Sequence, residues 1–328
     1  MRRASARCRS TGPTPAPVLV TGATGRQGGA TARALLSAGV PVRALVRDPA
    51  TERARAVAAL GAQLVTGDLL DRASVTRAAE GVRAVFSVQM PVFTEEGADF
   101  DNELAQATNL VEGARAAGAE QFVHTSVAGA GQHTEVPGWA EGHWDFMAPT
   151  LDTKAAIQDL VRTAGFARWT LIKPGFFMEN LLPSTAYLFP RGIDGDLITL
   201  IKPDTRLSLT AVTDIGTAAA AALTDPDRFH EVELELASEY RSMAEIADVL
   251  SRVLDRPITA PDLTLEEALA AGMPPMGASG AFMNAAGQPG RPEFARALGL
   301  PLTRFEDWAR DNLGEGGQSR SDMSSTNR

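Results

Sequence analysis

The sequence predicts an α/β fold, a Rossmann-type doubly wound parallel sheet with a smaller C-terminal α+β region on the substrate side. Three observations lead to this. From residue 17 to 174, short Val- and Leu-rich runs alternate with Ala-rich stretches of helical period. A glycine-rich turn follows the first of these runs. After Pro174 the alternation gives way to mixed, shorter pieces. Apolar strands that alternate with helices are typical of a parallel sheet buried on both faces.

The predicted elements follow one another along the chain. In the first part, strands are expected over 17–21, 41–46, 62–68, 82–88, 119–126 and 168–174. The helices between them are expected over 26–39, 50–61, 71–81, 98–118 and 152–165, with Asp71 as an N-terminal cap. In the second part, we expect strands over 196–200, 206–212 and 231–237 and helices over 213–225, 242–254 and 305–313.

These elements predict four segments. Residues 1–16 form a basic, disordered extension, and 17–174 form the Rossmann domain, to which later residues add strands. Residues 175–313 form the smaller substrate-side region. Residues 314–328 are polar and rich in Gly and Ser, which predicts a disordered tail.

Composition excludes several classes of protein. The 328 residues are 44% hydrophobic and 22% charged, with a net charge of −9, so a wide basic face for nucleic acid is not expected. No apolar run approaches the ~20 residues of a membrane span. The one cysteine, Cys8, allows neither an intrachain disulfide nor a cysteine metal site, and it favours a cytoplasmic protein without a metal.

The glycine-rich turn has the pattern of a dinucleotide site. The stretch VTGATGRQGG spans 20–29 and places Gly22, Gly25 and Gly28 three residues apart. Such a turn must be tight, must let backbone approach a pyrophosphate and must let the helix pack close to the strand. The following helix begins near Arg26, so its free N–H groups point at the phosphates. The alternative is a plain glycine-rich strand–helix turn.

The end of the second predicted strand favours NADP(H) over NAD(H). An NAD site usually has an acid there, which binds the ribose 2′-hydroxyl. Here Arg47 comes first and Asp48 follows. Arg47 can form a charge-assisted pair with a 2′-phosphate, and Arg26 could face the same group. Two alternatives stay open: both arginines are solvated surface residues, or Asp48 reaches the ribose.

Together these stretches resemble the NmrA-like family, in the atypical branch of the short-chain dehydrogenase/reductase superfamily. The family includes NADPH sensors and NAD(P)H:quinone oxidoreductase-like enzymes. The resemblance covers 17–310. It rests on TGATGRQGG (21–29), ALVRDP (44–49), GDLLD (67–71), LDTK (151–154) and PGFFMEN (174–180).

The resemblance implies further cofactor contacts. Asp68 and Leu69 would lie against the adenine, Gln89 beside the ribose and pyrophosphate, and the PGFF segment beside the nicotinamide. Each has a structural alternative, such as a turn aspartate, a strand-ending hydroxyl for Ser126, or a hinge with two core aromatics. The predicted cofactor-binding residues are Gly22, Thr24, Gly25, Arg26, Gln27, Gly28, Arg47, Asp68, Leu69, Gln89, Ser126, Lys154, Pro174, Gly175, Phe176 and Phe177.

The catalytic prediction rests on Lys154. Typical short-chain reductases use Tyr-x-x-x-Lys, and Lys154 occupies the lysine position, but Thr150 stands where the tyrosine should be. In one interpretation, Lys154 is the acid or stabilises a developing oxyanion. In the other, it only binds ribose hydroxyls. A histidine of the loop 127–147, His133 or His143, is a further candidate proton donor, whereas His124 is expected in the core.

Two functions follow. The first is an NADPH-dependent reductase that passes hydride to a small carbonyl, conjugated or quinone acceptor, with Lys154 as the catalytic residue. The second is a non-catalytic redox sensor that binds NADP(H) and regulates a protein partner. No direct nucleic-acid or membrane partner is expected. Apolar residues after Asn180 predict a hydrophobic acceptor pocket: Leu181, Leu182, Tyr187, Leu188 and Phe189.

Overall fold

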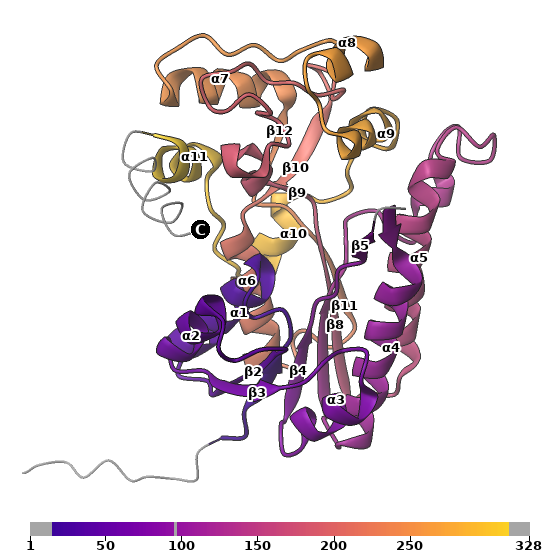
Figure 1. Ribbon diagram of the computed structural model, residues 1–328, viewed down its shortest axis with the longest axis vertical. Helices are drawn as coiled ribbons and strands as arrows, with labels where there is room; N and C mark the ends of the chain where they lie inside the picture. The colour runs from indigo at the N-terminus through magenta and orange to yellow at the C-terminus, as the bar shows by residue number, and fades with distance from the viewer. Residues whose placement is uncertain (1–14, 95–96, 315–328) are drawn as a thin grey trace, which may run out of the picture.

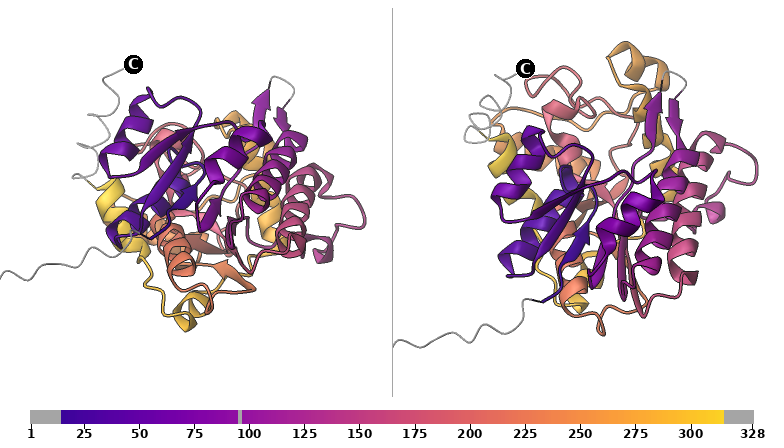
Figure 2. Two further views of the ribbon diagram at one scale, coloured as in Figure 1. Left: turned by 90° about the horizontal axis from the view of Figure 1, so that it is seen from below. Right: turned by 60° about the horizontal axis from the view of Figure 1, so that its bottom comes forward.

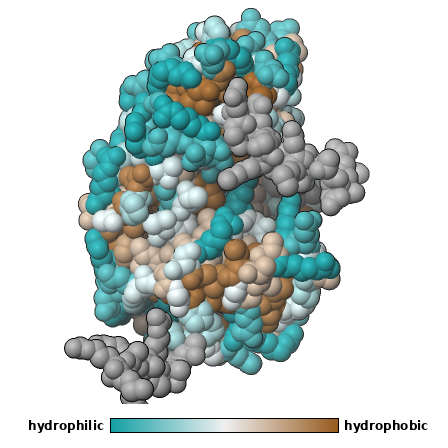
Figure 3. Space-filling model, turned by 90° about the vertical axis from the view of Figure 1, so that its left-hand side faces the viewer, coloured by the Kyte–Doolittle hydropathy of each residue, from teal (hydrophilic) through white to brown (hydrophobic). Residues whose placement is uncertain are grey.

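The structure, a computed structural model, describes residues 15–94 and 97–314 (Figure 1). Cys8, nearly all of the predicted N-terminal extension and residues 315–328 of the predicted tail lie outside this range. Within the described ranges, no helix is long and apolar enough to cross a bilayer. On the face shown in Figure 3, apolar side chains gather in separate patches between hydrophilic ones.

A seven-stranded, fully parallel sheet forms the centre of the molecule. Its spatial order is β11-β8-β7-β4-β1-β2-β3. The strands are β1 (Val18–Val20), β2 (Val42–Val46), β3 (Gln63–Thr66), β4 (Ala84–Ser87), β7 (Gln121–Thr125), β8 (Arg168–Pro174) and β11 (Val232–Leu236). The chain proceeds in one direction from β1 to β3 and in the other from β4 onward, so the order reverses between β1 and β4. The predicted doubly wound sheet is confirmed.

Helices cover both faces of this sheet (Figures 1 and 2). On one face lie α1 (Arg26–Ser37), α2 (Glu52–Ala59), α6 (Val212–Thr224) and α10 (Pro292–Ala297). On the other lie α3 (Arg72–Ala79), α4 (Phe100–Ala116) and α5 (Ala148–Thr163). Strand β1 shows why both are needed. Val18 and Val20 join the core under α1 and α6, and Leu19 joins the core under α3 and α4.

Apart from α6, β11 and α10, the second part of the chain lies at one end of the sheet, at the top in Figure 1. A three-stranded sheet of order β12-β10-β9 joins β9 (Phe176–Phe177), β10 (Arg206–Thr210) and β12 (Glu239–Ser242). The helices here are α7 (Met243–Val253), α8 (Leu265–Ala270), α9 (Ser279–Ala286) and α11 (Phe305–Leu313). Their core contains Phe189, Leu209, Leu250 and Phe305, which are all fully buried.

The sequence-based boundaries hold for most elements, with a few corrections. Strand β8 has the predicted bounds, and the Asp71 side chain accepts hydrogen bonds from the first turn of α3 as expected. The strand predicted over 196–200 is wrong: Leu197 and Ile198 are buried there without pairing in a sheet. A short hairpin of β5 (Val92–Thr94) and β6 (Gly97–Asp99) was not predicted.

Helices α1 and α6 touch through backbone at Gly216. An ideal Cβ on Gly216 would lie 2.5 Å from the carbonyl carbon of Ala30 and 2.6 Å from its oxygen. No side chain fits there without moving one helix. Because α1 follows the glycine-rich turn, this contact also sets where the turn lies.

We predict that Gly216→Ala destabilises the protein. Helix propensity alone would stabilise α6 by about 1 kcal/mol, but overpacking against Ala30 costs about 1–3 kcal/mol. Urea unfolding measures the net sign, and Thr217→Ala on the next residue is the control. A more stable Gly216→Ala variant would show that the helices separate easily.

Candidate functional site

The candidate site begins at the gap between β1 and β4, where the strand order reverses. Ligands of doubly wound sheets bind at the carboxyl ends of the strands at such a point. The buried Thr21 joins the two strand ends. Its Oγ1 accepts a hydrogen bond from Val88 N (3.0 Å) and lies 3.2 Å from Val88 O. The residue that precedes the glycine-rich turn is therefore held in place by the backbone that follows β4.

The turn is shaped for close approach by a ligand. Gly22 has φ +59°, a left-handed conformation that favours glycine. A Cβ on Gly28 would lie 2.3 Å from Gly22 O, so only glycine allows α1 to pack this closely on the turn. Gly22, Gly25 and Arg26 are exposed, and no described side chain caps the N-terminus of α1. These features fit a pyrophosphate, which would accept the free N–H groups.

Two other predicted contacts belong to the same turn. Thr24 and Gln27 are both partly buried. The Gln27 carbonyl accepts from Thr31 Oγ1 (3.0 Å) within α1, whereas Gln27 Oε1 is buried with no hydrogen-bond partner among the described residues. The side chain of Gln27 is therefore held at the turn with an unused acceptor.

Arg47 lies at the tip of β2 and is exposed, without a hydrogen-bond or ion-pair partner among the described residues. Asp48 is already engaged, because its Oδ1 accepts from Ala50 N at 2.7 Å. This local turn holds the carboxylate and leaves Arg47 as the available group. Arg26 lies close enough to Glu179 for its charge to act on that carboxyl.

The residues predicted at the adenine end form a turn after β3. Asp68 is exposed, and its Oδ1 accepts from Leu70 N (2.9 Å). Leu69 is partly buried against the core under α3 and α4, and its carbonyl accepts from Asn109 Nδ2 (3.0 Å). Asp68 thus performs the turn role that the sequence left open, and its second carboxylate oxygen, Oδ2, has no hydrogen bond within the described ranges.

A buried polar chain follows the ends of β4 and β7. Gln89 Nε2 donates to Ser87 Oγ (3.0 Å), and Ser87 Oγ is hydrogen-bonded to His124 Nδ1 (3.0 Å). Burial lowers the pKa of His124 to about 3, and the positive charge of Lys154 adds to the lowering. His124 is therefore neutral at physiological pH, and the prediction of a core histidine is confirmed.

Lys154, whose charge acts on His124, lies on α5. Its Nζ donates to Oε1 of Glu103, a fully buried residue of α4, while Lys154 itself keeps 14% of its side chain exposed. In the described part of the chain, Glu103 Oε2, His124 Nε2 and Thr125 Oγ1 are buried without a partner. Unpaired buried polar atoms are costly. Two of these residues are tied to Lys154, Glu103 by the ion pair and His124 by the effect of the lysine charge.

Ser126, directly after β7, is also held in place. Gln158 Nε2, from α5, donates to Ser126 Oγ (2.8 Å) and to Ala130 O (3.3 Å). Ser126 thus connects the end of β7 to α5 through Gln158, which lies one helical turn after Lys154.

The PGFFMEN segment links the two parts of the molecule. Pro174 ends β8, Gly175 is buried, and the Phe176 side chain enters the second core, whereas Phe177 is partly buried against the first. The Glu179 carboxylate accepts from Val212 N (3.2 Å) at the start of α6 and from Trp308 Nε1 (3.2 Å) of α11. Burial raises the pKa of Glu179.

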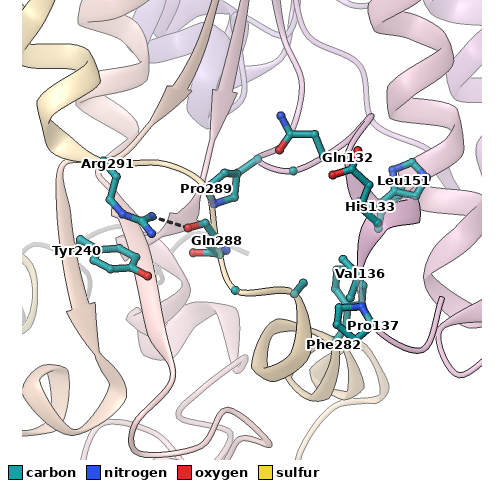
Figure 4. A pocket seen from close by; sticks show the side chains of 15 residues that line it. Gln132, His133, Val136, Pro137, Leu151, Tyr240, Phe282, Gln288, Pro289 and Arg291 are labelled. Atoms are coloured by element: carbon teal, nitrogen blue, oxygen red, sulfur yellow. Dashed lines mark hydrogen bonds between the residues drawn. The ribbon is translucent and has the colours of Figure 1, made fainter.

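A cavity of about 400 Å³ lies between the loop that follows Ser126 and the segment that leads into α10 (Figure 4). The loop after Ser126 and the start of α5 form one wall, and α9 with the segment before α10 forms the other. The predicted hydrophobic pocket is corrected: Leu181, Leu188 and Phe189 lie in the second core. The lining residues are Ala128, Gly129, Gln132, His133, Glu135, Val136, Pro137, Leu151, Tyr240, Phe282, Ala286, Gly287, Gln288, Pro289 and Arg291.

His133 lines this cavity, but neither of its ring nitrogens is free to donate a proton to a ligand. Gly131 N donates to His133 Nδ1 (3.1 Å), so Nε2 carries the proton and donates to Asp152 Oδ1 (2.8 Å). Both ring nitrogens are occupied, and the ring packs on Trp139. His143 is exposed in the same loop. The structure therefore favours a loop-fixing role for His133.

Sequence reasoning missed two groups near the site. Glu103 gave no signal because it lies 51 residues from Lys154 in the chain. Arg291, the basic residue of the cavity, follows a Gln-Pro-Gly stretch that looks like an ordinary loop. In the described residues, no cluster of three His, Cys, Asp or Glu side chains could hold a metal.

A polar network joins the last two strands of the sheet, β8 and β11, to the wall of the cavity. The buried Lys173 of β8 lies 2.8 Å from Glu233 and 3.6 Å from Glu235 on β11. Gly129 N, in the cavity wall, donates to the Glu235 carboxylate (3.3 Å). Burial raises the pKa of Glu235 to about 7, although the Lys173 charge opposes this.

Comparison with known proteins finds one family and several relatives. A model of the NmrA-like family matches residues 15–287. The chain is 31% identical over 251 residues to the NAD(P)H azoreductase of Xenophilus azovorans, covering 76% of this chain and 78% of that enzyme.

Two further similarities cover more of the chain. One is to a (4-alkanoyl-5-oxo-2,5-dihydrofuran-3-yl)methyl phosphate reductase of Streptomyces griseus subsp. griseus, 31% identical over 305 residues (90% of this chain, 97% of that one). The fold resembles that of Citrobacter sp. triphenylmethane reductase complexed with NADP(H), with a TM-score of 0.71 and 22% identity, over 90% of this chain and all of that one.

We predict a pH-dependent contribution of Glu235 to stability. The folded-state pKa of about 7 lies above the ordinary value of 4.5, so ionising Glu235 opposes folding. Relative to Glu235→Gln, the wild type should lose stability as the pH rises from about 4.5 to about 7, on the order of 3 kcal/mol. Urea unfolding at several pH values tests this, with the exposed Glu231→Gln, directly before β11, as control. A constant difference between wild type and Glu235→Gln would contradict it.

Proposed function

Because this chain belongs to the NmrA-like family, we propose that it is an NADPH-dependent reductase for a small carbonyl, conjugated or quinone acceptor. The observation that carries the proposal is a row of polar and glycine residues along the carboxyl ends of the parallel strands. It runs from Arg47, through the turn at Gly22–Gly28, to Lys154 with its buried partner Glu103. The two relatives at 31% identity are, by name, reductases.

NADP(H) fits the residues present. The turn at 22–28 would hold the pyrophosphate, and Arg47 would hold the 2′-phosphate through a charge-assisted pair. Asp68 and Leu69 would border the adenine, and Gln89, Ser126, Lys154 and Phe177 the nicotinamide half. When bound, the cofactor supplies a hydride. The single cysteine suits a protein of the reducing cytoplasm.

The chain's own contribution to the reaction is proton supply and electrostatic stabilisation. Reduction of a quinone or carbonyl needs one hydride and one proton. Lys154, as an ammonium held by Glu103, provides that proton or a positive charge for the developing oxyanion. His124 and His133 are neutral or fully bonded, so they do not take this role. The cavity lined by the loop after Ser126 and by Leu151, one helical turn before Lys154, receives the acceptor.

We predict that Arg47→Ala weakens NADPH binding by about tenfold or more, because a charge-assisted bond to the 2′-phosphate is lost. The dissociation constant for NADH should change less than about twofold. Isothermal titration with both cofactors measures this, and Arg53→Ala, exposed on α2, is the matched control. Equal losses for NADPH and NADH would remove the role assigned to Arg47.

We predict that Lys154→Ala lowers turnover about 10²- to 10⁴-fold, the usual contribution of a general acid. NADPH binding should persist, because the turn and Arg47 are untouched. The assay follows NADPH oxidation against a panel of quinones and carbonyls, with Lys202→Ala, exposed elsewhere, as control. If wild type binds NADPH tightly but oxidises it with no acceptor of the panel, the protein is a sensor rather than a reductase for these compounds.

A further inference from the structure

We propose that Arg291 and Gln288 form an oxyanion site at one end of the cavity, and that the acceptor carries a carboxylate, sulfonate or phosphate. This rests on the proposed function, since it assigns the acceptor's chemistry to the cavity that Leu151 of α5 lines. Figure 4 shows Arg291, Gln288 and Tyr240 together on one side of the cavity, with His133 and Leu151 on the other.

Arg291 is held in one orientation. Its Nη1 donates to the carbonyl oxygens of Gln288 (2.6 Å) and Gly290 (2.7 Å). Its guanidinium carbon lies 3.7 Å from the centre of the Tyr240 ring. A guanidinium carries five N–H donors, and these contacts use only one nitrogen. The remaining donors are therefore fixed in place before any ligand arrives.

The charge of Arg291 has no counterion within the described ranges. No carboxylate there lies within ion-pair distance of it, although many other arginines of the chain have such a partner. Arg206 provides the contrast. It also stacks on Tyr240, at 5.1 Å, but it pairs with Glu245 at 3.2 Å and does not line the cavity. An arginine that borders a cavity without a counterion is suited to bind an anion from solution.

Gln288 adds a second donor. Its Oε1 accepts from Ser208 N (2.7 Å), which fixes the orientation of the amide and leaves the Nε2 hydrogens without an acceptor in the described chain. This end of the cavity therefore presents donors, and its counterpart is a group that only accepts hydrogen bonds, such as a carboxylate, sulfonate or phosphate.

The opposite wall accounts for the rest of the ligand. Leu151, Val136 and Phe282 offer an apolar surface, which suits a flat conjugated body. Leu151 lies one helical turn before Lys154 on α5, and Gly129 comes three residues after Ser126. Glu135, the one acid of the lining, lies on the loop wall, so an anion would be directed to the Arg291 end.

Binding of redox-inert probes tests the site without turnover. We compare naphthoate with naphthamide, two planar ligands of one shape that differ in charge, by isothermal titration into the protein saturated with NADP⁺. Wild type should bind naphthoate about tenfold or more tighter than naphthamide. In Arg291→Gln the ratio should fall below about twofold, and in Arg291→Lys it should be intermediate.

The control is Arg206→Gln, which removes the same charge beside the same Tyr240 ring but outside the cavity, and should keep the wild-type ratio. A wild-type ratio near one, or an equal fall in Arg206→Gln, would overturn the oxyanion site. If Arg291→Gln does not fold, a wild-type ratio near one still overturns the site, and an unchanged ratio in Arg291→Lys does the same. Failure of the reductase function shows separately, as no NADPH oxidation with a naphthoquinone or its sulfonate.

Discussion

The contact between Gly28 and the backbone of the preceding turn determines the geometry on which the rest depends. A Cβ at this position would lie 2.3 Å from Gly22 O and 2.4 Å from Thr21 O. Helix α1 can therefore pack this closely on the turn only with glycine at position 28. Once α1 is placed, Gly216 brings α6 against Ala30, and Glu179 accepts from the first N–H of α6. Two close approaches, at Gly28 and at Gly216, thus connect the glycine-rich turn to α6, which contacts Glu179 of the PGFFMEN segment.

A second feature is the placement of positive charge in an acidic protein. The chain carries a net charge of −9, yet Arg47, Lys154 and Arg291 occur along the carboxyl edge of the sheet and its adjoining cavity. Their environments differ. Arg47 is exposed, Lys154 forms an ion pair with the buried Glu103, and Arg291 is stacked on Tyr240. These environments suit the three roles that we propose, namely capture of a phosphate, supply of a proton, and recognition of an acceptor.

Much of the fold could be predicted from the sequence because burial on two faces leaves a clear pattern. Strand β8 is an example of this pattern. The cap at Asp71 could be predicted for another reason, because it depends only on neighbouring residues. The segment 196–200 failed because a buried apolar coil has the same composition as a strand. In the site, local motifs were visible and long-range pairs were not. The turn at 22–28 is a contiguous motif, whereas the Lys154–Glu103 pair and the Tyr240–Arg291 stack join residues 51 positions apart in both cases, on separate elements.

The most direct measurement is an experimental structure of the complex with NADP⁺. We expect the pyrophosphate over the turn at Gly22–Gly28, the 2′-phosphate beside Arg47, and the nicotinamide within hydrogen-bond or van der Waals reach of Lys154. The cavity that contains Arg291 should then open toward the nicotinamide ring. A nicotinamide that lies away from Lys154, or a wall between the ring and the cavity, would contradict this assignment of the site.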